Sequence, residues 1–158
     1  MQQTDIKQLL MDKGVFAGLP EGHLAVLAEH ATERALAADD VLARQGEEAK
    51  AFYLILEGAL VIEVPAIAGP RLEITRLHEG EVFGWSWLIA PYTWHFHARA
   101  AAGGARVIEF DGKALLERCE ADPGFGYPVL RRFSELMARR LDAAQRKMMD
   151  QWSPPGFA

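Results

Sequence analysis

Residues 32–110 form a run of short β-strand patterns separated by glycine-containing turns, and this run limits the possible folds more than any other feature. The strand patterns are rich in β-branched, aromatic and leucine residues. The segment 71–77 alternates polar and apolar residues, which predicts a strand with one buried face. Many short strands with frequent glycine turns favour an antiparallel sandwich or jelly roll over a parallel sheet.

Two of the glycine-containing turns, at Gly58 and at Gly103-Gly104, are predicted to reverse the chain between separate strands. The predicted strands on either side of these turns are 52–56 and 59–64, and 94–100 and 106–110. In 94–100, Phe96, Ala98 and Ala100 share one face, and His95, His97 and Arg99 share the other. Together these patterns predict about eight strands.

Helical patterns lie on both sides of the strand run. Apolar residues at helical spacing predict a helix over 5–12 and a second helix that begins near Pro20 and buries Leu24, Leu27 and Ala28. Asp111 is a suitable N-cap for a short helix, and a long helix is expected from about 126 or 128 to 150. The sequence therefore predicts one domain in four parts: N-terminal helices (1–31), a β-roll (32–110), C-terminal helices (111–150) and a proline-rich, disordered tail (151–158).

Composition restricts the class of protein. The 158 residues suit a single domain, and the net charge of −5 disfavours nucleic-acid binding through bulk electrostatics. No apolar run approaches the roughly 20 residues that span a bilayer, and the N-terminus lacks the pattern of a signal peptide. The single cysteine, Cys119, is consistent with a reducing compartment. We therefore expect a cytoplasmic protein that makes no membrane contact.

The order of these patterns, together with three sequence runs, resembles the cyclic nucleotide-binding domain. The runs are FAGLP at 16–20, FYLILEG at 52–58 and LHEGEVFG at 77–84. This family includes the sensory domains of catabolite activator-type regulators and the regulatory subunits of kinases. The resemblance implies a double-stranded β-helix, or jelly roll, followed by a long C-terminal helix. It covers nearly the whole chain.

In that family the segment after the Phe-Gly pair is the phosphate-binding cassette, whose turn and helix N-terminus direct N–H groups at the cyclic phosphate. The resemblance implies a glutamate that accepts from the ribose hydroxyl and an arginine that neutralises the phosphate. Here the glutamate position falls on Trp85. The arginine position falls near Trp94, or on Thr93 or His95 if the loop is shifted by one residue. Losing the arginine contact costs about 1.5–3 kcal/mol, and we expect the losses of the arginine and the carboxylate together to weaken cyclic AMP binding by several powers of ten.

The tryptophan-rich segment 80–100 then has two interpretations. In one, an indole ring stacks on a planar, nucleotide-like or other small ligand, and histidine or arginine side chains replace the missing cation. In the other, the rings of Trp85, Trp87 and Trp94 fill the pocket and no ligand is needed. The candidate ligand-binding residues are Phe83, Gly84, Trp85, Ser86, Trp87, Leu88, Thr93, Trp94, His95, His97 and Arg99.

The long C-terminal helix carries an apolar stripe that steps by three or four residues. In the family this helix forms a dimer interface and links ligand occupancy to output. The stripe that predicts a homodimer consists of Leu130, Phe133, Met137, Leu141, Ala144 and Met148, with Trp152 beyond it. The alternative is that the stripe packs only on its own β-roll. Transcription regulators of the family continue into a helix-turn-helix domain, which we do not find after this helix, so direct DNA binding is not expected.

These observations predict a non-enzymatic sensory or regulatory module that responds to a small ligand and whose helix movement is read by an unknown partner protein. The alternative function is a ligand-independent dimeric scaffold. No catalytic residues can be assembled, because the sequence has no nucleophile–base motif and no phosphate-binding glycine motif. His95 and His97 alone are too few ligands for a metal site, and no cofactor is expected.

Overall fold

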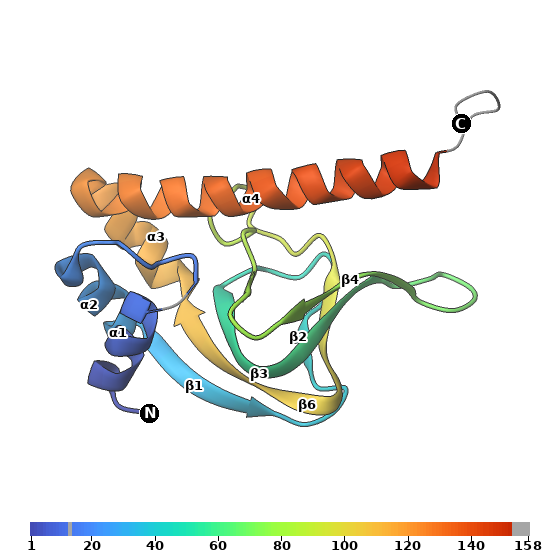
Figure 1. Ribbon diagram of the computed structural model, residues 1–158, viewed down its shortest axis with the longest axis horizontal. Helices are drawn as coiled ribbons and strands as arrows, with labels where there is room; N and C mark the ends of the chain where they lie inside the picture. The colour runs from blue at the N-terminus through green and yellow to red at the C-terminus, as the bar shows by residue number, and fades with distance from the viewer. Residues whose placement is uncertain (13, 153–158) are drawn as a thin grey trace.

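The computed structural model describes residues 1–12 and 14–152 and contains a curled antiparallel sheet with helices at one end and across one side (Figure 1). Six strands form a sheet of order β1-β6-β3-β4, in which β2 also pairs with β6 and β5 with β3. This is the jelly-roll type of fold predicted from the sequence. The strands are β1 (Ala31–Leu36), β2 (Val41–Ala43), β3 (Ala51–Val64), β4 (Leu72–His78), β5 (Val82–Phe83) and β6 (His97–Asp111).

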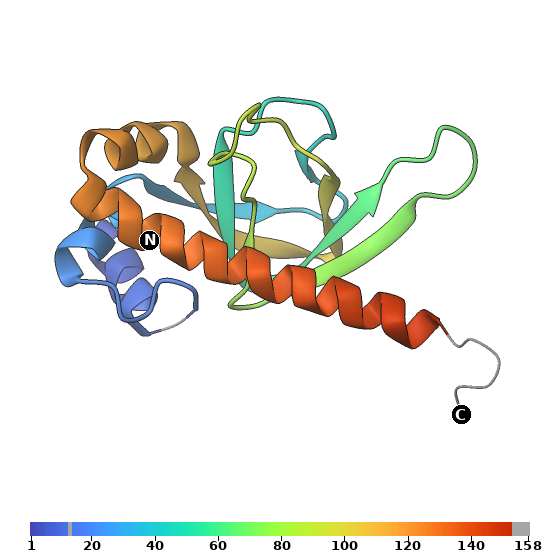
Figure 2. The ribbon, with the colours of Figure 1, turned by 90° about the horizontal axis from the view of Figure 1, so that it is seen from above.

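The described residues form four helices: α1 (Gln3–Asp12), α2 (Glu21–Glu29), α3 (Gly112–Ala121) and α4 (Pro123–Gln151). The first three gather at one end of the roll, and α4 runs from that end along the whole length of the sheet (Figures 1 and 2). The predicted buried face of α2, formed by Leu24, Leu27 and Ala28, is confirmed.

The predicted turns at Gly58 and Gly104 are wrong. Both glycines lie inside long strands, β3 and β6, which pair antiparallel along most of their length. Gly58 and Gly104 have φ angles of 78° and 74°, and a Cβ atom on Gly58 would lie 2.3 Å from the carbonyl oxygen of Gly104. The two glycines therefore let the paired strands bend together, and register shifts on both sides of Gly58 accompany the bend. The described residues form six strands in place of the expected eight, because β3 and β6 are each one long strand.

Two packed cores result from this bend. The helix-side core lies between the helices and the outer surface of the sheet and contains Phe16, Leu24, Phe52, Trp87, Phe110, Phe125 and Phe133. The roll interior lies on the concave side and contains Tyr53, Ile55, Leu60, Ile62, Leu77, Phe83, Trp94, Ala98, Ala100 and Val107.

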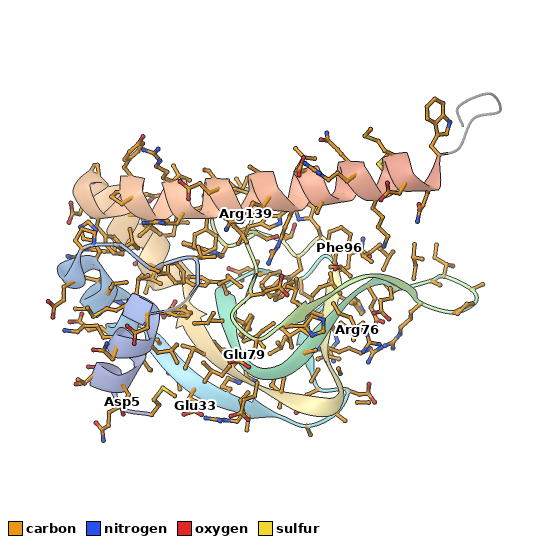
Figure 3. All side chains as sticks on the ribbon, viewed as in Figure 1. Asp5, Glu33, Arg76, Glu79, Phe96 and Arg139 are labelled. Carbon is orange, nitrogen blue, oxygen red and sulfur yellow. The ribbon has the colours of Figure 1, made fainter. Side chains whose placement is uncertain are left out.

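Strand β4 departs from the predicted alternation. Only Leu77 of β4 is buried, and Leu72 is 63% exposed. The side chains of β4 are exposed because β4 is an edge strand and the β3–β4 hairpin extends beyond the roll (Figure 1). Phe96 is likewise not buried: it precedes β6 and is 37% exposed, whereas Ala98 and Ala100 are buried as predicted (Figure 3).

The C-terminal helices begin at acidic caps. The side chain of Asp111 accepts from the N–H of Ala114 at 3.0 Å, which confirms it as the cap of α3. Asp122 caps α4 by accepting from the N–H of Gly124 at 3.1 Å. Helix α4 therefore begins at Pro123, earlier than predicted, because proline is tolerated in the first helical turn. It also extends through Gln151, the first residue of the expected tail, and residues 153–158 lie outside the described residues.

Candidate functional site

The site begins at Gly84, directly after the two-residue strand β5. Gly84 has a φ angle of 104°, a region that favours glycine. A Cβ atom there would lie 3.2 Å from Cη2 of Trp94 and 3.3 Å from the carbonyl oxygen of Ala51. The chain can therefore approach β3 closely and turn away only because residue 84 has no side chain.

Residues 84–96, all of which the structure describes, form a loop without an α-helix. A turn at its start is closed by the N–H of Leu88, which donates to the carbonyl of Trp85 at 3.0 Å. The far end is fastened to the loop between β2 and β3. There the N–H of Gly46 donates to Trp94 at 2.8 Å, and the N–H of Trp94 donates to Glu47 at 2.9 Å. The loop thus begins with a local turn, and its far end is attached to the β2–β3 loop.

Trp94 lies inside the roll. Its side chain is 6% exposed and stacks on Phe83, with ring centroids 5.1 Å apart and an interplanar angle of 18°. Phe83 in turn stacks on Tyr53 at 6.1 Å. Three aromatic rings therefore follow one another through the roll interior, and Trp94 is one of the three positions, with Thr93 and His95, to which the resemblance assigned the family's arginine.

Trp87 belongs to the other core. It is 1% exposed, stacks on Phe52 at 4.9 Å, and meets Phe133 of α4 edge to face at 5.1 Å. Its Cβ atom packs against Gly112, where an added Cβ would lie only 2.9 Å away. Trp87 therefore connects the loop to α3 and α4 and does not face the roll interior.

Trp85, Ser86 and His95 contact one another in the loop, and the rings of Trp85 and His95 reach the surface. The half-buried indole of Trp85 stacks on the exposed imidazole of His95 at 4.8 Å. The buried hydroxyl of Ser86 lies 3.3 Å from Nδ1 of His95. The sequence placed these residues in one candidate site, and the structure does bring these three together.

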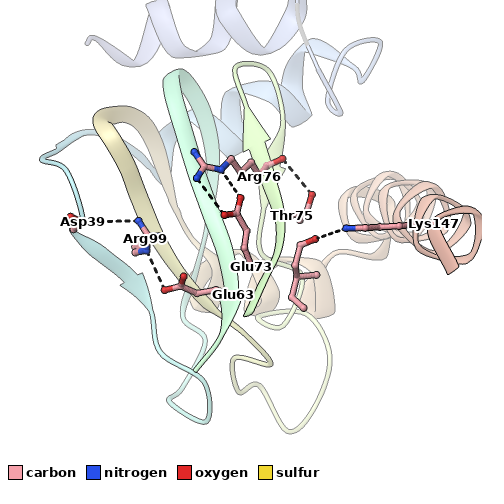
Figure 4. A network of polar contacts seen from close by, with 8 residues as sticks. Asp39, Glu63, Glu73, Thr75, Arg76, Arg99 and Lys147 are labelled. Atoms are coloured by element: carbon pink, nitrogen blue, oxygen red, sulfur yellow. Dashed lines mark hydrogen bonds and ion pairs between the residues drawn. The ribbon is translucent and has the colours of Figure 1, made fainter. Parts of the chain in front are cut away.

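Arg99 lies on the outer face of the sheet. Because Ala98 and Ala100 face the roll interior, the alternation of β6 directs Arg99 outward. Its guanidinium donates to Oε1 of Glu63 at 3.2 Å and to Oδ1 of Asp39 at 2.9 Å (Figure 4). Arg71 also donates to Oε1 of Glu63, at 3.0 Å. Arg99 is therefore engaged in an ion-pair network on the opposite side of the sheet from Trp94.

The remaining expected ligand residues contact neighbouring loops. Nδ1 of His97 accepts from the N–H of Gln45 at 2.9 Å, so this ring nitrogen carries no proton. Thr93 forms an isolated bridge with Glu48, and Leu88 packs against the helix-side core. The eleven candidate residues are thus divided among the roll interior, the helix-side core, the surface and the outer face of the sheet.

Sequence reasoning missed Glu63, a carboxylate that is only 2% exposed. It lies at the end of an apolar run in β3, where nothing in the sequence distinguishes it from a solvent-facing residue. Its burial depends on Arg71 and Arg99, which are distant in sequence. A hollow of about 170 Å³ was also not predicted, and it lies away from the loop, between α1, β3 and the turn at Gly80.

Helix α4 carries the residues expected at a dimer interface. Leu130, Leu141 and Met148 are 41%, 60% and 69% exposed; Ala144 is exposed and Met137 half-buried. Phe133 is a correction to that set, because it is fully buried in the helix-side core. The next residue, Ser134, takes its place on the exposed stripe. The stripe then consists of two sets of residues spaced by seven: Leu130, Met137 and Ala144 in one, and Ser134, Leu141 and Met148 in the other.

No group of three or more His, Cys, Asp or Glu side chains that could hold a metal ion occurs in 1–12 and 14–152. Within the same residues, no helix is both long and apolar enough to cross a membrane.

Comparison with solved structures shows the same fold in other proteins. A protein from Geobacter metallireducens described as a cyclic nucleotide-binding protein is 24% identical, with a TM-score of 0.76 over 86% of this chain and 97% of its own. The sensor domain of the transcriptional regulator DNR from Pseudomonas aeruginosa is 22% identical, with a TM-score of 0.69 and coverages of 89% and 93%. The regulatory domain of Toxoplasma gondii PKA, solved with cAMP, is 20% identical, with a TM-score of 0.68 over 85% of this chain and 50% of its own.

Comparison of the sequence gives the family. None of the curated proteins matches the chain significantly. The family model of the cyclic nucleotide-binding domain, however, matches residues 33–122, which is more than half of the sequence and includes the whole roll after the first residues of β1. The chain therefore belongs to the cyclic nucleotide-binding domain family and is a regulatory, signal-transduction domain.

Proposed function

We propose that this chain is a non-enzymatic regulatory module that works without ordinary cyclic nucleotides and acts through helix α4. The observation that carries this proposal is the position of Trp94, whose indole is buried in the roll interior against Phe83 and Gly84. A nucleotide in the roll would have to displace this ring. Exposing about 150–250 Å² of aromatic surface costs roughly 4–6 kcal/mol, which weakens binding by a factor of about 10³–10⁴.

The polar groups of the loop support the same proposal. Trp85 offers no carboxylate to a ribose hydroxyl, and Arg99 faces the outer side of the sheet, where it is paired with Glu63. An enzymatic role is disfavoured because the Ser–His contact in the loop, between Ser86 and His95, is incomplete as a catalytic group. Within residues 1–12 and 14–152, no carboxylate hydrogen bonds to His95, so the contact with Ser86 lacks the third member of a triad.

Titration calorimetry with cyclic AMP and cyclic GMP tests the proposal. We expect no saturable heat up to about 1 mM nucleotide, which corresponds to a binding free energy weaker than about −4 kcal/mol. The double substitution Trp85→Glu and Trp94→Arg restores the two charged residues and removes the buried indole, so we expect measurable cyclic AMP binding by that variant. Trp152→Arg is the matched control, and we expect no saturable heat of cyclic AMP binding from that variant. Micromolar binding by the unaltered chain would overturn the proposal.

A second candidate is a sensor of a small planar ligand, and one observation favours it. The stacked rings of Trp85 and His95 both reach the surface, and the hydroxyl of Ser86 adjoins them. Protein purified from its host would then release a small molecule on denaturation, which mass spectrometry identifies. Such a ligand would also change the tryptophan emission, and Trp85→Ala would abolish that change.

The output of the module is proposed to be α4, through a second copy of the chain and a partner protein that reads the helix. The exposed residues of α4 support a paired helix, because two sets spaced by seven form the seam of a coiled coil. We expect a dimer in sedimentation velocity at tens of micromolar, and a monomer for Leu141→Asp. Ala143→Asp adds the same charge on a different face of the helix and leaves the dimer intact. A monomeric unaltered chain contradicts this part of the proposal.

The compartment and the cofactor requirement belong to the same proposal. Cys119 is a free, half-buried thiol, which is consistent with a module that works in the reducing cytoplasm. No cofactor, metal, membrane or DNA contact enters the proposed function.

A further inference from the structure

Helix α4 consists of an anchored half and a free half, and Arg140 lies at the boundary between them. Val129, Phe133 and Leu136 are buried, whereas every residue from Leu141 to Gln151 is exposed. Figure 2 shows the second half passing the base of the β3–β4 hairpin and continuing beyond the roll, away from the hairpin tip. Whatever holds α4 at Arg140 therefore determines the direction of the exposed helix.

Arg140 donates its guanidinium to the main-chain carbonyl of Val82. Val82 is fully buried and is the first residue of β5, two residues before the turn at Gly84. Burial lowers the pKa of Arg140, and the nearby carboxylate of Glu81 opposes that effect. A half-buried cation therefore contacts the strand that leads directly into residues 84–96, which we call the tryptophan loop.

Lys147 makes a second contact of the same kind, two helical turns later on the same face of α4. Its Nζ atom donates to the main-chain carbonyl of Ile74 at 3.4 Å (Figure 4). Ile74 is the residue left without a partner where the register of β3 and β4 shifts between Thr75 and Glu73. Two cations of α4 therefore bind main-chain carbonyls of the β4–β5 region.

We infer that Arg140 is a positioning residue that couples the backbone of β5, and hence the tryptophan loop, to the direction of the free half of α4. A half-buried guanidinium without an acceptor costs free energy. Arg140 therefore has two distinct states, one bonded to Val82 and one moved out to solvent. A movement of the loop that shifts Val82 releases Arg140, so that the exposed half of the helix loses its attachment to β5 and keeps the weaker contact of Lys147 with Ile74. This inference rests on the proposed function, in which α4 is the output.

Hydrogen exchange measured by mass spectrometry on the full chain tests the inference. Arg140→Met keeps the apolar stem and removes every donor, and Arg140→Lys keeps a charged donor. The matched control is Arg139→Met, because Arg139 is exposed and no hydrogen bond or ion pair involves its guanidinium within the described part of the chain (Figure 3). Exchange in 141–151 is expected to become about tenfold faster in Arg140→Met, less so in Arg140→Lys, and unchanged in Arg139→Met. Unchanged exchange in Arg140→Met overturns the inference.

A purely structural anchor gives the same first result, so a second comparison separates coupling from anchoring. Trp94→Ala perturbs the loop beside Phe83 and is expected to speed exchange in 141–151 when Arg140 is present. In the Arg140→Met background the same substitution is expected to add nothing. An equal effect in both backgrounds, or none in either, overturns the coupling. The proposed function is tested by a separate measurement. It fails if the unaltered chain binds a cyclic nucleotide, whatever the exchange experiments show.

Discussion

The indole of Trp87 and the ring of Phe133 meet edge to face, with centroids 5.1 Å apart, and so join the loop after β5 to the long helix α4. Both side chains are buried, at 1% and 0% exposure, and both also contact Phe52 at the centre of the helix-side core. The contact explains why Phe133 is unavailable to a second copy of the chain. It also places Trp87 in the hydrophobic core, where its main effect is on stability.

Trp87→Ala is therefore expected to lower the free energy of unfolding by about 3–5 kcal/mol, because it removes a buried indole and leaves a cavity. Urea denaturation followed by circular dichroism measures the loss. Trp152→Ala removes the same side chain from a site that is 72% exposed and is expected to change stability by less than about 0.5 kcal/mol. Equal effects of the two substitutions would contradict the assignment of Trp87 to the core.

Trp94→Ala is expected to leave an apolar cavity in the roll interior that free indole can occupy. The variant loses stability, as any large-to-small core substitution does, but added indole should recover part of it because the ligand binds only the folded state. The measurement is the melting temperature with and without indole. The unaltered protein and Trp152→Ala serve as controls and should show no rise, and a variant that does not respond to indole would argue against a ring-filled interior.

Gly58→Ala is expected to be strongly destabilising, by more than about 2 kcal/mol, because a Cβ atom would lie 2.3 Å from the carbonyl of Gly104 at a φ angle of 78°. Gly22→Ala is the matched control. Gly22 lies in α2, and nothing is within 4 Å of the added atom, so this change is expected to stabilise by about 0.5–1 kcal/mol. Thermal unfolding of both variants checks the opposite signs.

Alkylation of Cys119 is expected to be slow in the folded protein. Burial raises the pKa of this thiol to about 11 from an ordinary value of 9.0, so at pH 8 the thiolate fraction falls roughly 100-fold. The rate of reaction with iodoacetamide should therefore rise steadily with pH up to about 11. Protein unfolded in guanidinium provides the control and reacts at the ordinary rate. Since the folded state holds the proton more tightly, the associated stability is present below pH 9 and declines as the pH rises towards 11.

Local patterns were sufficient for several features of the fold. The buried face of α2, the cap at Asp111 and the inward position of Ala98 and Ala100 follow from spacing and capping chemistry within a few residues. The family was also readable from the sequence, because its motifs are runs of adjacent residues. In each case the physical cause lies close to the residue along the chain.

Other features depended on partners that are distant in sequence. A glycine with positive φ permits either a reversal or a bend, and only the opposing carbonyl of Gly104 makes Gly58 a bend. Steps of three and four residues fit both Phe133 and Ser134, and the packing of Trp87 decides between them. The sequence by itself therefore determined the family, the buried face of α2 and the presence of three indoles in one segment. Only the tertiary structure decided which indole fills the roll, which joins the core and which reaches solvent, because burial depends on what packs against each ring.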